Sequence, residues 1–113
     1  MLPVIALGVF AVAALFGAFL AFKHFTGARL PTPVALLHGL FAASGIVVLL
    51  LAYMQDALPS MAKIALGLFV VAALGGFVLF AHHLKRKKLP SPVVLIHAGV
   101  AVTAFLILGV SIL

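Results

Sequence analysis

The chain has 113 residues, of which 67% are hydrophobic and only 7% are charged, and its formal net charge is +6. A domain of this size leaves much of its surface exposed, so this composition excludes a water-soluble fold. The chain has no cysteine, which excludes disulfides, thiolate metal sites and covalent attachment of a c-type haem. Runs of about 20 apolar residues are typical of helices that span a bilayer. We therefore expect one all-α integral membrane domain, residues 1–113.

Four apolar stretches predict four transmembrane helices, in chain order over residues 3–25, 33–53, 61–84 and 92–113. Pro3 suits the first turn of the first helix, where its missing N–H has no partner to lose. Gly27 suits the C-cap of the same helix. Proline pairs precede the second and fourth helices and prevent the preceding helices from continuing. Ser60 is placed to cap the third helix.

The second half of the chain repeats the first at an offset of 59 residues. The segment Leu30-Pro31-Thr32-Pro33 returns as Leu89-Pro90-Ser91-Pro92, and aligning residues 5–54 with residues 64–113 gives 20 identities in 50 pairs. Each repeat contains two spans, so both repeats have the same orientation and are related by an axis along the membrane normal. The predicted architecture is a four-helix bundle of two tandem hairpins, with repeat 1 at about 1–54 and repeat 2 at about 60–113.

The positive charges lie almost entirely at one end of this bundle. Only Lys63 falls at the other end, beside the single acidic residue, Asp56. By the positive-inside rule, the hairpin loops 26–32 and 85–91 face the cytoplasm and both termini face outward, in a bacterial inner membrane. Charges that flank apolar spans in this way do not form a nucleic-acid surface. The six basic residues at the loop end are Lys23, Arg29, Lys85, Arg86, Lys87 and Lys88.

Histidines at matching positions of the two repeats are the candidate functional residues. His24 and His83 end the first and third helices, and His38 and His97 lie about 8 Å into the second and fourth, at 1.5 Å per residue. Ionisable side chains inside a membrane are costly and point to function. A single such histidine often only bonds a neighbouring carbonyl or hydroxyl, but four matched ones favour a cofactor. His82 matches Lys23 and is expected at the interface.

Haem b with two axial histidines is the cofactor that fits this pattern, since imidazole is a usual axial ligand. We expect His38 and His97 as the axial pair, and His24 and His83 as an alternative or second pair. Basic loop residues suit the propionates, and a quinone can share this depth. A small residue seven positions from each histidine shares its helical face and suits a flat macrocycle: Gly17, Gly45, Gly76 and Ala104. Phenylalanines expected to cover the ring are Phe22, Phe25, Phe41 and Phe80.

Other functions have less support. A zinc or copper site lacks a nearby carboxylate, and no carboxylate orients a histidine for triad catalysis, so we assign no catalytic residue. Length and span count are similar to those of small multidrug-resistance transporters, but the membrane-embedded glutamate of that family is missing. An accessory subunit without a cofactor, in a respiratory or photosynthetic complex, stays open as the alternative. Close helix packing is expected at Gly8, Gly17, Gly39, Gly45, Gly67, Gly75, Gly76 and Gly99.

Overall fold

Four α-helices make up the protein in a computed structural model that describes all residues, 1–113. They are α1 (Leu2–Phe25), α2 (Thr32–Met54), α3 (Ser60–Leu84) and α4 (Ser91–Ile112). Each is long and apolar enough to cross a membrane, because 22 to 25 residues span more than the roughly 30 Å hydrocarbon layer. The prediction of an all-helical protein with four candidate spans is confirmed, and each predicted helix end lies within one residue of the observed one.

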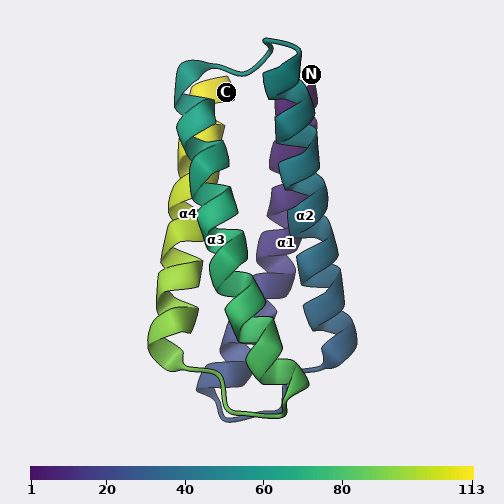
Figure 1. Cartoon of the computed structure of the whole chain (residues 1–113), viewed down its shortest axis with the longest axis vertical. Helices are drawn as coiled ribbons and strands as arrows, with labels where there is room; N and C mark the ends of the chain where they lie inside the picture. The colour runs from purple at the N-terminus through teal and green to yellow at the C-terminus, as the bar shows by residue number, and fades with distance from the viewer.

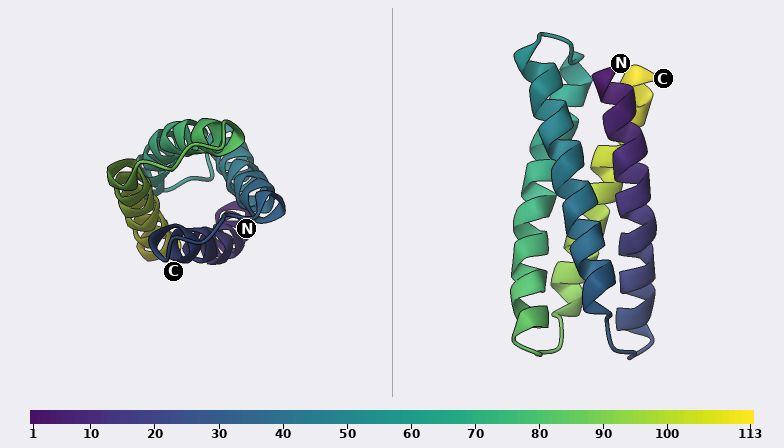
Figure 2. Two further views of the ribbon diagram at one scale, coloured as in Figure 1. Left: turned by 90° about the horizontal axis from the view of Figure 1, so that it is seen from below. Right: turned by 90° about the vertical axis from the view of Figure 1, so that its right-hand side faces the viewer.

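The helices form an elongated bundle that is 42 Å long (Figure 1). In cross-section they occupy the corners of a square, in which α1 and α3 lie on one diagonal and α2 and α4 on the other (Figure 2). Both termini and the α2–α3 loop are at one end, and the α1–α2 and α3–α4 loops are at the other. Helices of the same hairpin pack together more extensively than the two hairpins pack against each other.

Backbone geometry explains where the helices begin and end. Pro31 and Pro90 adopt extended conformations as the N-caps of α2 and α4, as expected for proline at a helix start. Gly27 follows α1 with a φ of 75°, and Ala28 N–H donates to the Lys23 carbonyl at 2.9 Å. This is a Schellman motif, which confirms the predicted cap. The expected cap at Ser60 is wrong: Ser60 is already helical, and Pro59 is the N-cap. Proline fixes φ for the turn but has no side chain that can accept a bond.

The core is narrow and is filled mainly by alanine and a few large side chains. At its centre Phe10 of α1 stacks on Phe69 of α3, with ring centroids 3.7 Å apart and planes at 1°. Leu49 and Leu108 are completely buried beside this stack. Large apolar side chains also cover the outside of the bundle, where for example Leu15 is 73% exposed. An apolar exterior of this kind suits contact with lipid rather than with water.

Only half of the glycines expected at close helix contacts are found there. A Cβ on Gly45 would lie 2.7 Å from the Phe10 ring, so this glycine is required by the aromatic stack. Gly17, Gly75 and Gly76 lie against histidine side chains. The other four have no atom within 4 Å of an added Cβ, so the prediction is wrong for Gly8, Gly39, Gly67 and Gly99. Membrane helices are rich in glycine throughout, which is why residue type alone did not identify the contacts.

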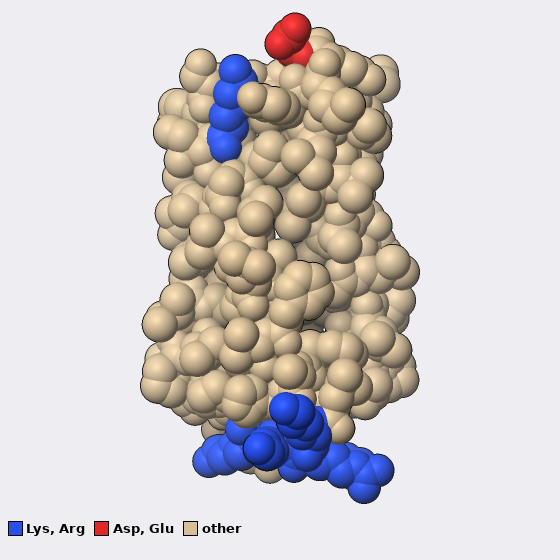
Figure 3. Space-filling model, in the orientation of Figure 1, with Lys and Arg blue, Asp and Glu red and all other residues tan.

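Charge is segregated along the bundle axis. Lysine and arginine side chains gather around the α1–α2 and α3–α4 loops, whereas Lys63 and Asp56 lie at the opposite end (Figure 3). The apolar belt between these two ends carries no acidic or basic residue other than histidine. The histidines therefore lie in the half of the bundle that carries the basic end.

Candidate histidine sites

His38 of α2 points into the bundle and is fixed there by the backbone of α1. Its Nδ1 lies 2.8 Å from the Ala13 carbonyl oxygen. A carbonyl can only accept, so Nδ1 carries the proton and the neutral ring keeps a lone pair on Nε2. The ring is seated against Gly17, where an added Cβ would come within 2.8 Å of Cε1. A backbone bond at one nitrogen and a glycine beside the ring together set the orientation of the imidazole.

His97 of α4 repeats this arrangement in the second hairpin. Its Nδ1 donates to the Ala72 carbonyl at 2.7 Å, and its Cε1 would lie 3.2 Å from a Cβ on Gly76. The imidazoles of His97 and His38 approach each other across the α2–α4 diagonal, with centroids 6.1 Å apart and planes at 84°. Both rings are half-buried. The structure thus brings one pair of predicted ligands together edge-on near the bundle axis, each with Nδ1 engaged and Nε2 without a hydrogen bond.

The second pair of predicted ligands lies at the loop end and has a different environment. His24 Nε2 and the Ser91 hydroxyl are hydrogen-bonded at 2.9 Å, and His83 Nε2 and the Thr32 hydroxyl are bonded at the same distance. Each bond joins one hairpin to the other. His24 is only 8% exposed and is the one buried polar side chain of the protein. Nε2 is therefore engaged by a hydroxyl in both of these residues, in contrast to Nε2 of His38 and His97.

His82 bonds only its own helix, whereas two of the phenylalanines expected to cover a cofactor contact the loop-end histidines. His82 is half-buried, and its Nδ1 donates to the Val78 carbonyl of its own helix at 2.9 Å. Phe22 and Phe25 have 65% and 53% of their surface exposed, and the Phe25 ring also contacts the His24 ring edge-on, with centroids 4.8 Å apart. Phe80 lies against His83, with ring centroids 6.1 Å apart. The helices are apolar all round, so the sequence pattern did not show which phenylalanines face inward.

The predicted groove beside each histidine is filled by side chains of another helix. Gly17 was expected to leave space for a ligand of His24, and Gly45 for a ligand of His38. In the structure Gly17 contacts the His38 ring and Gly45 contacts Phe10. Spacing within one helix identifies a shared face but not the neighbour that packs on it. The small residues make room for imidazole and phenyl rings, and the expectation of open grooves at these positions is corrected.

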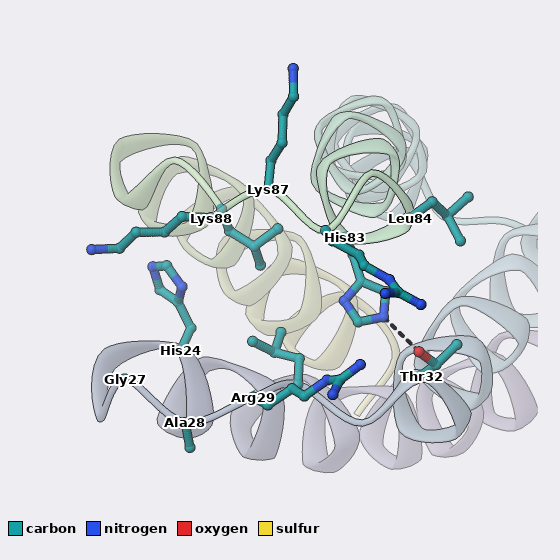
Figure 4. Close-up of a pocket in the computed structure, with 12 residues that line it drawn as sticks. His24, Gly27, Ala28, Arg29, Thr32, His83, Leu84, Lys87 and Lys88 are labelled. Atoms are coloured by element: carbon teal, nitrogen blue, oxygen red, sulfur yellow. Dashed lines mark hydrogen bonds between the residues drawn. The ribbon is translucent and has the colours of Figure 1, made fainter.

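A cavity of about 800 Å³ lies between the two hairpin loops, beyond the central histidine pair (Figure 4). His24 and His83 contribute to its wall, together with Arg29, Thr32 and Lys88, whereas His38 and His97 do not. The wall of the cavity is therefore basic, although apolar surface makes up more than half of it. Its volume is within the range of roughly 300–1,000 Å³ that is usual for small-molecule sites.

Only His38 and His97 approach each other, whereas His24 and His83 each bond a hydroxyl of the other hairpin. No three His, Asp or Glu side chains lie together in a group that could hold a metal ion. The site residues that the sequence analysis missed are the hydroxyls Thr32 and Ser91 and the carbonyls of Ala13 and Ala72. The hydroxyls occupy matching positions of the repeated Leu-Pro-x-Pro segment, and this was the one signal that could have identified them. Backbone carbonyls leave no signal in a sequence.

Comparison of the chain with protein-family models, with curated proteins and with solved structures gives no match.

Proposed function

We propose that the protein is a small membrane cytochrome that binds haem b non-covalently, with His38 and His97 as the axial ligands. The observation that carries this proposal is the facing pair of imidazoles, each with its Nδ1–H held by a backbone carbonyl. A metal-ligating histidine usually donates its second nitrogen to such a partner, which fixes the ring and makes the coordinating nitrogen more basic.

The donor set fits an iron held between two axial imidazoles. Bonds from a metal to an imidazole nitrogen are about 2 Å long, so two axial rings on one metal have their centres about 6 Å apart. The observed separation of the His38 and His97 rings is 6.1 Å. The two residues come from diagonally opposite helices, α2 and α4, and bundle cores hold cofactors between facing helices in this way.

Space for the macrocycle has to come from the seam between the hairpins. The hairpins contact each other less than the helices within each hairpin do, so separating them breaks fewer contacts than opening a hairpin. The two hydroxyl–histidine bonds at the loop end are the polar contacts that join the hairpins. Binding is therefore expected to move α1–α2 relative to α3–α4 and to leave each hairpin intact.

A bound haem b supplies a one-electron carrier inside the bilayer. The residues of this chain orient and shield it. The carbonyls of Ala13 and Ala72 accept the Nδ1–H of His38 and His97 and so keep Nε2 of each imidazole unprotonated. The Phe10–Phe69 stack fills the core on the side nearer the chain termini. Electron transfer to or from a quinone, within a larger respiratory complex, is the role we assign to such a carrier. His24 and His83 remain the candidates for a second pair of haem ligands. Ligation through Nε2 would first require their hydrogen bonds to Ser91 and Thr32 to break.

The proposal includes the internal repeat and the orientation in the membrane. Contacts between residues 59 positions apart support a two-fold relation of the hairpins, because Phe10 meets Phe69 and His38 meets His97. The bonds His24–Ser91 and His83–Thr32 are also equivalent under this offset. The excess of basic residues at the loop end supports a cytoplasmic location of residues 26–32 and 85–91 in a bacterial inner membrane.

The test is a reduced-minus-oxidised absorbance spectrum of the protein purified in mild detergent after expression with added haem. We expect a sharp α-band and a shifted Soret band, which indicate a low-spin haem with two imidazole ligands. His38→Ala and His97→Ala should each abolish the signal. His82→Ala is the matched control, because His82 bonds only its own helix, and it should keep the full signal.

Folding must be checked independently of colour, by circular dichroism and by gel filtration of each variant. Folded wild-type protein without absorbance would contradict the cytochrome assignment. The accessory-subunit alternative would then stand, and proteins that co-purify with the chain from its native membrane would identify the complex.

A further inference from the structure

The cavity between the hairpin loops has a wall of unusual charge. Arg29, Arg86, Lys87 and Lys88 all contribute to it, and no carboxylate does. The only acidic side chain of the protein, Asp56, is at the opposite end of the bundle, as is the chain's C-terminus. Cations near helix ends are common because they set membrane topology, so charge alone does not indicate a site. What distinguishes these residues is that they line a half-open space without any anion of the protein to balance them.

Two of the cations that line this space come from equivalent positions of the two hairpins. Arg29 lies between His24 and His83 in the close-up, and Lys88 extends on the side of His24, whereas Lys87 points away (Figure 4). Arg29 and Lys88 are 59 residues apart, as are His24 and His83. Each hairpin thus contributes one imidazole to the cavity, and the cations are unequally divided: the first hairpin supplies Arg29, and the second supplies Arg86, Lys87 and Lys88.

The imidazole of His24 presents a free nitrogen to this space. Its Nε2 is bonded to Ser91, and no bond is made by Nδ1. No buried side-chain nitrogen or oxygen in the protein lacks a partner, so Nδ1 must retain accessible surface although the residue is 92% buried as a whole. The cavity is the open space that His24 lines. The wall therefore offers a ring nitrogen that is held in place, in addition to flexible cations.

We propose that this cavity binds a phosphate group that carries net negative charge. Arginine pairs with phosphate oxygens through its planar fork, lysine adds a point charge, and imidazole and hydroxyl groups donate single bonds. Basic pockets between transmembrane helices are known to accept anionic headgroups. The proposal does not depend on haem, because the cavity excludes His38 and His97.

Two sources can supply such a phosphate, and the experiment separates them. In the first arm, inorganic phosphate or pyrophosphate is added to the full chain in nanodiscs of phosphatidylcholine. In the second arm, the nanodiscs contain phosphatidic acid and no phosphate is added. Thermal unfolding is followed by circular dichroism. Saturating ligand should raise Tm by about 5 °C or more. A rise in the first arm indicates a soluble phosphate, and a rise in the second arm alone indicates a lipid headgroup.

Charge-matched variants test whether the cavity itself is responsible. Arg29→Gln with Lys88→Gln removes two cations that line the cavity and should weaken binding at least tenfold. Lys23→Gln with Lys85→Gln removes two cations from the same end that do not line it, and should change affinity less than threefold at 0.15 M salt. Arg29, Lys85 and Lys88 are exposed and Lys23 is half-buried over the Phe19 ring; none of the four is in the core, so both double variants should fold. Equal losses in the two double variants, or no rise in Tm in either arm, would overturn the proposal.

Discussion

Phe10 and Phe69 stack face to face at the centre of the bundle, with their rings 3.7 Å apart and parallel to within 1°. This stack is the only large aromatic contact between α1 and α3, the helices on one diagonal. Along the same axis, nearer the loops, the other diagonal is bridged by His38 and His97. The interior therefore changes from an apolar pair to an imidazole pair along the bundle.

Gly45→Ala should destabilise the protein by about 1–3 kcal/mol, because the new methyl group meets the Phe10 ring at 2.7 Å and overpacks the core. Gly39→Ala is the matched control on the same helix, since no atom lies within 4 Å of its added Cβ. It should be neutral or stabilise by up to about 1 kcal/mol, through the higher helix propensity of alanine. Unfolding in mixed micelles with increasing sodium dodecyl sulfate measures both. Similar losses for the two variants would contradict the observed packing.

Ser91→Ala should cost about 1–3 kcal/mol, because it leaves the buried Nε2 of His24 without a partner. Thr32→Val removes the equivalent bond to His83 in a more exposed setting and should cost less than about 1 kcal/mol. Double-mutant cycles with His24→Ala and His83→Ala isolate the two pair energies from the same unfolding experiment. A larger coupling for the exposed pair than for the buried one would be inconsistent with this account.

Gly27 and Arg86 occupy equivalent C′ positions after α1 and α3, with φ of 75° and 55°. Left-handed backbone is unstrained for glycine and costs roughly 1 kcal/mol or more for other residues. Arg86→Gly should therefore stabilise the protein by about 0.5–1 kcal/mol, and Gly27→Ala should destabilise it by a similar amount. Thermal unfolding of both variants checks the opposite signs, and a change of the same sign in both would refute the explanation.

Membrane orientation can be measured directly because the chain has no cysteine. Thr26→Cys places a single thiol in the α1–α2 loop, and Ala57→Cys places one in the α2–α3 loop; both positions are exposed. The positive-inside rule predicts that a membrane-impermeant maleimide labels Cys at position 57 in intact cells. The thiol at position 26 should react only after the membrane is opened. The reverse pattern would show that the basic loops face outward.

Helix positions were predictable from the sequence because two independent signals coincide. Apolar runs of spanning length give the helices, and proline pairs at residues 31–33 and 90–92 give two of the starts. Ser60 was misassigned because a polar residue near a helix start resembles a cap, while Pro59 before it already redirects the chain. The candidate histidines were found because charge-bearing residues are rare in an apolar chain.

The inward faces of the helices were not predictable in the same way. Helices that are apolar all round have no polar side to mark the outside, so Phe22 and Phe10 look alike in the sequence, although one is largely exposed and the other buried. The partner of each glycine depends on packing between helices, which spacing within one helix does not contain. For this reason the ring of His38, and not a free groove, was found beside Gly17.

The measurement that tests the central claim most directly is a haem titration of two double variants in detergent. His38→Ala with His97→Ala removes the facing pair, and His24→Ala with His83→Ala removes the hydroxyl-bonded pair. We predict one haem per wild-type chain, no low-spin haem in the first variant, and unchanged stoichiometry with a low-spin spectrum in the second. If the first variant, shown to be folded, still bound low-spin haem while the second did not, His38 and His97 would not be the axial ligands.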